Sequence, residues 1–173
     1  MQKTITSKIK VSSNGHKLGF EKIGQSYSFT YDDISLLPDQ ISEIRHRSEC
    51  DTSVDFLGIR LGIPIIGSPM NTVVGGKMMK ALADLKCLGI MHRFNTIDEQ
   101  LKEFTENGLQ NSDFKSAAIG INKNTDIERL RRLADYGIKI ICIDIANGGS
   151  RMIEEFLDSS QKIVSEYGLK LIG

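Results

Sequence analysis

The sequence around Asp144 suggests that this carboxylate has a chemical role. It lies in a hydrophobic run, KIICIDI (139–145), and a glycine-containing turn, ANGGS (146–150), follows that run. A carboxylate beside an apolar core is costly unless a partner binds it. Its side chain therefore either fastens the turn or faces a ligand.

Polar turns of the same kind follow three other hydrophobic runs. They read SPMNTVVGG (68–76), HRFN (92–95) and NKNT (122–125). In the second turn, Arg93 carries a permanent charge whose planar fork suits phosphate or carboxylate, so we expect it to contact an anion. Two alternatives are that Arg93 pairs locally with Asp98 or Glu99, and that His92 and Arg93 form a catalytic pair.

The elements that position these turns alternate regularly. Short apolar runs predict strands over 62–67, 88–92, 116–121, 139–145 and 169–173, and helical spacing predicts helices over 75–86, 96–108, 124–137 and 150–168. Four βα units and the start of a fifth strand predict an α/β fold with a parallel sheet. Two architectures fit this pattern, an open doubly wound sheet and part of a (β/α)8 barrel, and both bind ligands at the carboxyl ends of their strands.

Composition excludes several classes of function. The 173 residues contain 22 basic and 22 acidic side chains, so no large field attracts nucleic acid or an anionic membrane. No apolar stretch is long enough for a transmembrane helix, and the first residues do not resemble a signal peptide. Neither GxGxxG nor a P-loop is present. No metal site is expected, because His16, His46 and His92 are far apart in the chain.

The three cysteines indicate reduced thiols. Cys50, Cys87 and Cys142 are scattered and form no CxxC spacing. An odd and sparse set of this kind is typical of a cytoplasmic protein. Cys142 lies inside an apolar run, so we expect it to be a buried small hydrophobic residue.

Five motifs resemble the IMP dehydrogenase/GMP reductase family. They are YDDISLLP (31–38), RSECDTSV (47–54), IPIIGSPMNTV (63–73), IMHRF (90–94) and IDIANGGS (143–150). The resemblance implies that residues 27–173 are the N-terminal half of a (β/α)8 TIM barrel, and that residues 1–26 are an N-terminal extension. A complete barrel takes about 250 residues, so this chain has room for only half of one.

Two features separate the branches of that family. The link GLQNSDFKS (108–116) leaves no room for the CBS modules that IMP dehydrogenases usually insert, and DIANGGS replaces their serine-rich turn. The GMP reductase branch is therefore favoured, which implies an oxidoreductase of purine salvage that uses NADPH to convert GMP to IMP and ammonia. The alternative is an IMP dehydrogenase that oxidises IMP with NAD and lacks CBS modules.

The resemblance also implies roles for particular residues. Cofactor-binding residues are Arg47, which reaches a neighbouring subunit, Arg93, Asp144, Ile145 and Ala146. Ser68, Met70 and Asn71 match residues beside the bound purine nucleotide. Asn71 is a departure, because many relatives have an aspartate there.

No catalytic residue is expected in this chain. In the family, a cysteine on the loop after the sixth strand attacks purine C2, and a threonine and a glutamate of the later half assist ammonia loss; Cys50, Cys87 and Cys142 do not match that position. The chain alone should therefore be inactive. Three scenarios follow. A separate C-terminal half completes the barrel, the chain is a truncated remnant, or two identical chains pair to form a barrel-like assembly. The resemblance also implies that the complete protein forms a homo-tetramer. A non-catalytic module that binds purine nucleotide or NADP is a further alternative.

Overall fold

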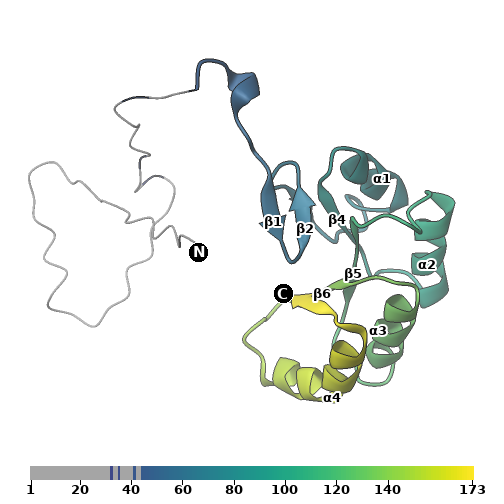
Figure 1. Cartoon of the computed structure of the whole chain (residues 1–173). Coiled ribbons are helices and arrows are strands. Elements are labelled where there is room, and N and C mark those ends of the chain that lie inside the picture. The colour runs from purple at the N-terminus through teal and green to yellow at the C-terminus, as the bar shows by residue number, and fades with distance from the viewer. Residues whose placement is uncertain (1–31, 33–34, 36–40, 42–43) are drawn as a thin grey trace, which may run out of the picture. The chain divides into compact units, whose positions relative to one another are not determined.

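The computed structural model describes Asp32, Ser35, Ile41 and residues 44–173 (Figure 1). The chain divides into two units after Cys50, and each unit is described by itself. In the first, a short 3-10 helix, η2, spans Arg47–Glu49. The predicted extension, residues 1–26, lies outside the described residues, so its boundary stays a prediction.

The second unit is built on a parallel sheet of five strands. They are β3 (Ile66–Gly67), β4 (Leu88–Met91), β5 (Lys115–Ile119), β6 (Ile140–Ile143) and β7 (Lys170–Ile172). Their order in the sheet follows their order in the chain, and each neighbouring pair is parallel. A doubly wound sheet contains a point where the strand order reverses. The described sheet has no such reversal, which is consistent with part of a (β/α)8 barrel.

Four helices follow the strands and lie along one side of the sheet (Figure 1). They are α1 (Gly76–Asp84), α2 (Ile97–Glu106), α3 (Asp126–Asp135) and α4 (Arg151–Tyr167). A capping box begins α2, because the Thr96 side chain accepts from the Glu99 amide while the Glu99 side chain accepts from the Thr96 amide. The mixed α/β fold and the order of elements predicted from the sequence are confirmed.

The first predicted strand is much shorter than its apolar run. Residues 62–67 were expected to be extended, but β3 contains only Ile66 and Gly67. The Ile65 amide donates to the Ile63 carbonyl at 2.8 Å, which folds the preceding residues into a turn. Pro64, inside that turn, has no amide to give to a strand ladder.

A hairpin that the sequence reasoning missed precedes the sheet. β1 (Val54–Phe56) pairs antiparallel with β2 (Ile59–Leu61). The connecting residues, Leu57 and Gly58, both have positive φ (50° and 89°), as a two-residue type I′ turn requires. Such turns usually contain Asn-Gly, and this one contains Leu-Gly. The sequence therefore lacks the signal that normally identifies a hairpin turn.

The two faces of the sheet pack against different partners. On the helix side, Ile141 and Ile143 of β6 join a core that includes the fully buried Phe104 and Phe156. On the other side, Ile140 joins Leu61 of the hairpin and Leu88 in a smaller cluster. Alternate residues of one strand therefore serve two cores, which explains why its sequence is apolar throughout.

Candidate functional site

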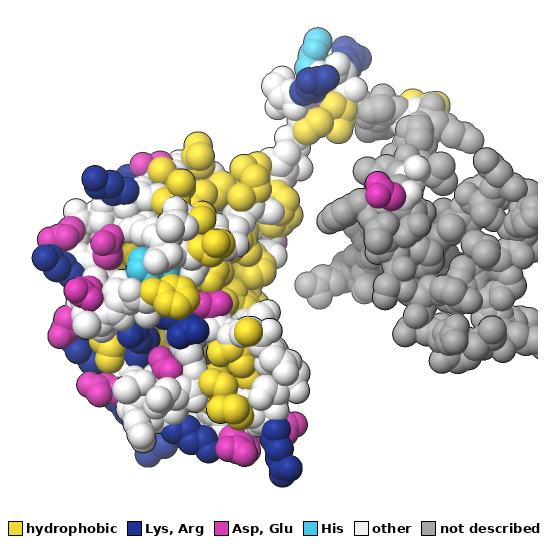
Figure 2. All heavy atoms as spheres, turned by 180° about the vertical axis from the view of Figure 1, so that it is seen from behind, with side chains coloured by type: hydrophobic (Ala, Val, Ile, Leu, Met, Phe, Trp, Pro, Cys, Tyr) yellow, Lys and Arg dark blue, Asp and Glu magenta, His cyan; other side chains and the backbone are white. Residues whose placement is uncertain are grey.

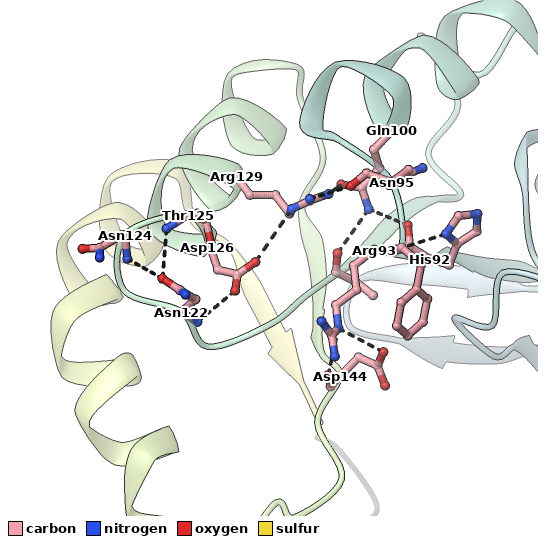
Figure 3. A network of polar contacts seen from close by, with 12 residues as sticks. His92, Arg93, Asn95, Gln100, Asn122, Asn124, Thr125, Asp126, Arg129 and Asp144 are labelled. Atoms are coloured by element: carbon pink, nitrogen blue, oxygen red, sulfur yellow. Dashed lines mark hydrogen bonds and ion pairs between the residues drawn. The ribbon is translucent and has the colours of Figure 1, made fainter.

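The carboxyl ends of the strands bring several predicted residues to one edge of the sheet. Arg93 follows β4, Asp144 follows β6, and Gly120, after β5, lies between them in the sheet order. The Asp144 amide donates to the Ile119 carbonyl at 2.9 Å, so Asp144 continues the sheet ladder by one residue. This parallel register is what places residues 51 positions apart side by side (Figure 3).

Arg93 and Asp144 bind each other. The Arg93 Nε donates to the Asp144 backbone carbonyl at 3.0 Å and lies 3.3 Å from Asp144 Oδ2. Both side chains are 31% exposed. Asp144 is therefore stabilised by a partly exposed ion pair, and its position does not require a ligand. The alternative that Arg93 pairs with Asp98 or Glu99 is wrong, because Asp98 accepts from Arg132 and Glu99 caps α2.

The pair keeps unused hydrogen-bonding groups. Among the described residues, the two Nη groups of Arg93 and Asp144 Oδ1 have no partner. The guanidinium lies over the Phe94 ring, 5.0 Å from its centroid. A Cβ at Gly120 would lie 3.3 Å from Arg93 Nη1, so the missing side chain leaves room for the guanidinium. A planar cationic fork and a carboxylate oxygen are thus both available to a ligand at this edge.

A buried polar network holds the Arg93 loop in place. Gln100 is fully buried and donates to the carbonyls of His92 (2.9 Å) and Ala118 (3.1 Å). Arg129 donates to Gln100 Oε1 and to the Asn95 carbonyl, both at 2.8 Å. These bonds tie the loop after β4 to β5 and to α3 (Figure 3). Sequence reasoning missed Gln100 and Arg129, since neither belongs to a recognisable motif.

The network includes a largely buried ion pair between Arg129 and Asp126. Arg129 lies 3.7 Å from Asp126, and the two side chains are only 12% and 13% exposed. Burial lowers the pKa of Arg129, the Asp126 carboxylate opposes that effect, and the nearby Arg93 adds to the lowering. Asn95 Oδ1 is buried and has no hydrogen-bond partner among the described residues.

The NKNT turn shows ordinary loop chemistry. Asn122 Oδ1 accepts from the amides of Asn124 (2.9 Å) and Thr125 (3.3 Å), and the Asn122 amide donates to Asp126 at 2.9 Å. These bonds form a local turn before α3. Its polar residues therefore satisfy one another.

The turn after Asp144 is open. Ile145 is half-buried, Ala146 is exposed, and nothing lies within 4 Å of a Cβ built on Gly148. A shallow cavity of about 450 Å³ is lined by Gly148, Gly149 and the first residues of α4, which Ser150 caps. The turn is held from within, because the amides of Gly149 and Ser150 donate to the Asn147 side chain and carbonyl, both at 3.2 Å.

The predicted nucleotide residues lie on the loop after β3. Ser68, Met70 and Asn71 are all exposed, and the Met70 carbonyl accepts from the amides of Val73 and Val74 at 2.9 Å. Asn71 also lines a cavity of about 540 Å³. No hydrogen bond described here links these three residues to Arg93 or Asp144, so they form a second, separate part of the same sheet edge.

The remaining candidates are placed as follows. Arg47 is exposed in η2 of the first unit. The Phe94 amide donates to His92 Nδ1 at 3.2 Å, which gives that imidazole a local role in the turn. Cys142 is only partly buried; burial raises the pKa of its thiol, and Asp144 raises it further.

The described residues contain no group of three or more His, Cys, Asp or Glu side chains arranged to hold a metal ion. None of their helices has the length and apolar composition needed to cross a membrane.

Comparison with known proteins identifies the family. The model of the IMP dehydrogenase / GMP reductase domain matches residues 28–173. The GMP reductase of Staphylococcus carnosus (strain TM300) is 36% identical over 132 residues, which cover 72% of this chain and 38% of that protein. The GMP reductase of Bacillus subtilis (strain 168) is 33% identical over 138 residues, covering 78% and 40%.

A third relative, the GMP reductase of Acidovorax ebreus (strain TPSY), is 35% identical over 132 residues, which cover 75% of this chain and 39% of that protein. The matched region thus spans about two fifths of the length of these curated relatives. Since the family model covers most of the chain, including the sheet and the edge described above, this protein belongs to the IMP dehydrogenase / GMP reductase family.

Proposed function

We propose that this chain forms the cofactor side of a GMP reductase-type enzyme, which reductively deaminates GMP to IMP and ammonia with NADPH. The observation that carries this proposal is the Arg93–Asp144 pair, which keeps free donors and a free acceptor beside an open glycine turn. The curated relatives are named GMP reductases, which favours this reaction over oxidation of IMP by an IMP dehydrogenase.

The residues at this edge fit NADPH. The Arg93 Nη groups suit a phosphate or amide oxygen, and Asp144 Oδ1 suits an amide N–H. Ile145 and Ala146 give a partly exposed apolar surface on which a flat ring can lie. When bound, NADPH supplies the hydride for the reduction. In this proposal the chain itself orients the cofactor, and the Gln100–Arg129 network keeps the Arg93 loop from moving away.

The purine nucleotide is assigned to the loop after β3. Ser68 offers a hydroxyl and Asn71 an amide, and Met70, at 54% exposure, offers a polarizable surface for a purine ring. Asn71 differs from the aspartate of many relatives in donating as well as accepting. The proposed role of Arg47 is to contact the cofactor of a neighbouring subunit in a homo-oligomer.

The sheet is proposed to be part of a (β/α)8 barrel. Its strand order never reverses, and the helices cover one side only. In such a barrel, β3 and β7 each gain a second neighbour from the remaining βα units, which also carry the catalytic cysteine. Those units come from further residues or from a separate C-terminal half, and the chain of 173 residues turns over no GMP without them. A cytoplasmic location is part of this proposal.

Binding of NADPH tests the cofactor assignment. The full chain is titrated with NADPH, and binding is followed by the nucleotide's fluorescence. Arg93→Gln should weaken binding about tenfold, because one charge-assisted contact is lost. Arg132→Gln is the matched control: it removes a guanidinium paired with Asp98, outside the candidate site, and should change nothing. Equal weakening by both variants would refute the assignment.

Turnover tests the reaction. The chain is assayed with GMP and NADPH, alone and with the purified C-terminal half of the Bacillus subtilis GMP reductase. Turnover only in the mixture supports the proposal. Turnover with IMP and NAD in place of GMP and NADPH would instead favour the dehydrogenase reaction. NADPH binding without turnover in any mixture would leave a binding module, and absence of both would refute the enzyme proposal.

A further inference from the structure

The amino-terminal edge of the sheet, opposite the candidate site, contains a cavity of about 790 Å³. Its walls are the turn of the β1–β2 hairpin and the loops that lead from the helices into β4, β5, β6 and β7. This cavity is here called the basic groove. The charged residues that line it are Arg60, Lys86, Asp113, Lys115, Lys139 and Lys170. Since the chain as a whole has equal numbers of acidic and basic residues, this excess of positive charge is local.

Two of these lysines are free to bind a ligand. Lys86 and Lys170 are exposed, and their ammonium groups have no partner among the described residues. The other cations are engaged. Arg60 pairs with Asp51 and Asp55 at 3.3 and 3.1 Å, Lys139 donates to the Tyr167 carbonyl at 2.9 Å, and Lys115 donates to the Gln110 carbonyl.

The backbone of Lys86 is strained. It has a φ of 55°, in the left-handed region that lysine rarely adopts. The other three turns from a helix into the next strand use glycine in this conformation, at Gly108, Gly137 and Gly168. Lys86 thus carries a cost that a glycine would avoid, and its side chain lines the basic groove.

The register of the strands gathers the lysines. Lys170 pairs with Ile140 and donates its amide to the Lys139 carbonyl at 2.8 Å. Lys115 and Lys139 directly precede the paired residues Ser116 and Ile140. Because neighbouring strands lie about 4.8 Å apart, the stems of these three lysines start within roughly 10 Å of one another.

We infer that the basic groove binds the phosphate chain of a small phosphorylated molecule. Among the described residues that line this cavity, five carry a positive charge and one, Asp113, carries a negative charge. Its volume lies in the range of small-molecule pockets, which favours a compact anion over an extended acidic peptide. This inference is independent of the proposed NADPH site, which lies at the other edge of the sheet.

Titration of the full chain with inorganic tripolyphosphate tests the inference. Calorimetry should show saturable binding that weakens as ionic strength rises. The double variant Lys86→Gln, Lys170→Gln should bind roughly tenfold more weakly, since each exposed lysine contributes a few-fold to affinity. Lys77→Gln, Lys162→Gln is the matched control: both lysines are exposed, neither has a described partner, and neither lines the groove. It should bind as the unaltered chain does.

A second variant separates binding from folding. Lys86→Gly removes the charge and relieves the strained backbone, so it should bind tripolyphosphate about fivefold more weakly while its melting temperature does not fall. Arg132→Gln, which removes a guanidinium outside both sites, should bind tripolyphosphate unchanged.

Three results would overturn the inference. The first is absence of tripolyphosphate binding. The second is equal weakening by the groove and control variants, or loss of binding through Arg93→Gln alone. The third is tighter binding of an oligoglutamate peptide than of tripolyphosphate, which would make the groove a docking surface for protein.

Discussion

At the scale of single residues, the Arg93–Asp144 pair is the central feature of the candidate site. Each residue taken alone suggests a ligand contact, yet the structure shows that each is first a partner of the other. Both remain useful to a ligand because the pair uses only Nε and Oδ2, together with the Asp144 carbonyl. The side chain that holds this arrangement is Gln100, which the sequence did not distinguish from any other helical glutamine.

Replacement of Gln100 by leucine should therefore destabilise the protein by about 2–3 kcal/mol. The change leaves the His92 and Ala118 carbonyls and the Arg129 guanidinium without their buried partner. Urea unfolding measures the loss. The exposed Gln161→Leu serves as control and should stay within about 0.5 kcal/mol. Similar values for the two variants would contradict the structural role of Gln100.

Cys142 should react slowly with iodoacetamide. Its pKa is raised by burial and by Asp144, so the reactive thiolate forms only above the usual pH range. Exposed Cys50 should be alkylated first, as peptide mass spectrometry at neutral pH can show. Faster labelling of Cys142 than of Cys50 would contradict this order.

The same shift has a consequence for stability. In the unfolded chain the Cys142 thiol ionises at its ordinary pKa, whereas in the folded chain it stays protonated to higher pH. Its contribution to stability is therefore complete below the unfolded pKa and is lost as pH rises through the folded pKa. Cys142→Ser should flatten the decline of the melting temperature between neutral and alkaline pH.

At the scale of elements, the turns between helices and strands obey one rule with one exception. Glycine holds the left-handed residue in three of them, and Lys86 holds it in the fourth. Two helix ends have the signals that their sequences suggest, the capping box at Thr96 of α2 and the glycine at the end of α4. The exception, Lys86, lines the basic groove.

Lys86→Gly should accordingly stabilise the protein by about 0.5–1 kcal/mol, because the left-handed backbone strains only residues with a Cβ. The converse change, Gly168→Ala, should cost about 1 kcal/mol, since nothing within 4 Å crowds a Cβ there and only φ matters. Thermal unfolding of both variants provides the comparison. Destabilisation by Lys86→Gly would mean that the lysine side chain contributes more to the fold than its exposure indicates.

At the scale of the whole unit formed by residues 51–173, hydrophobic side chains gather along one flank (Figure 2). The segment from the turn before β3 to the first turns of α1 exposes Ile65 (52%), Met70 (54%), Val73 (42%) and Met78 (45%). β3, at one end of the five-stranded sheet, has one neighbour among the described strands, β4. Exposed apolar groups beside an unpaired strand edge favour association with another segment.

Ile65→Gln with Met78→Gln should therefore weaken association with the C-terminal half of the Bacillus subtilis GMP reductase by about tenfold, because two apolar contacts are lost. Sedimentation of mixtures measures the affinity. Leu57→Gln, at an exposed position of the hairpin turn, should leave the affinity unchanged. No association by the unaltered chain would contradict the proposed completion of the barrel.

Much of this architecture could be predicted from the sequence because its signals are local. Apolar runs marked four of the five strands closely, while Pro64 and the turn at Ile65 shortened the first. The β1–β2 hairpin was missed because Leu57 adopts a conformation that its type disfavours. The polar turns were identified as a set, but ordinary loop chemistry at Asn122 could not be separated from a ligand site without their contacts.

The sequence by itself determined the α/β alternation, the family resemblance and the positions of Arg93 and Asp144 at strand ends, because periodicity and motifs depend only on residues close in the chain. Only the tertiary structure decided the strand order, the pairing of Arg93 with Asp144 and the gathering of lysines at the opposite edge. These features join residues tens of positions apart, and strand register and packing, which no local pattern records, bring them together.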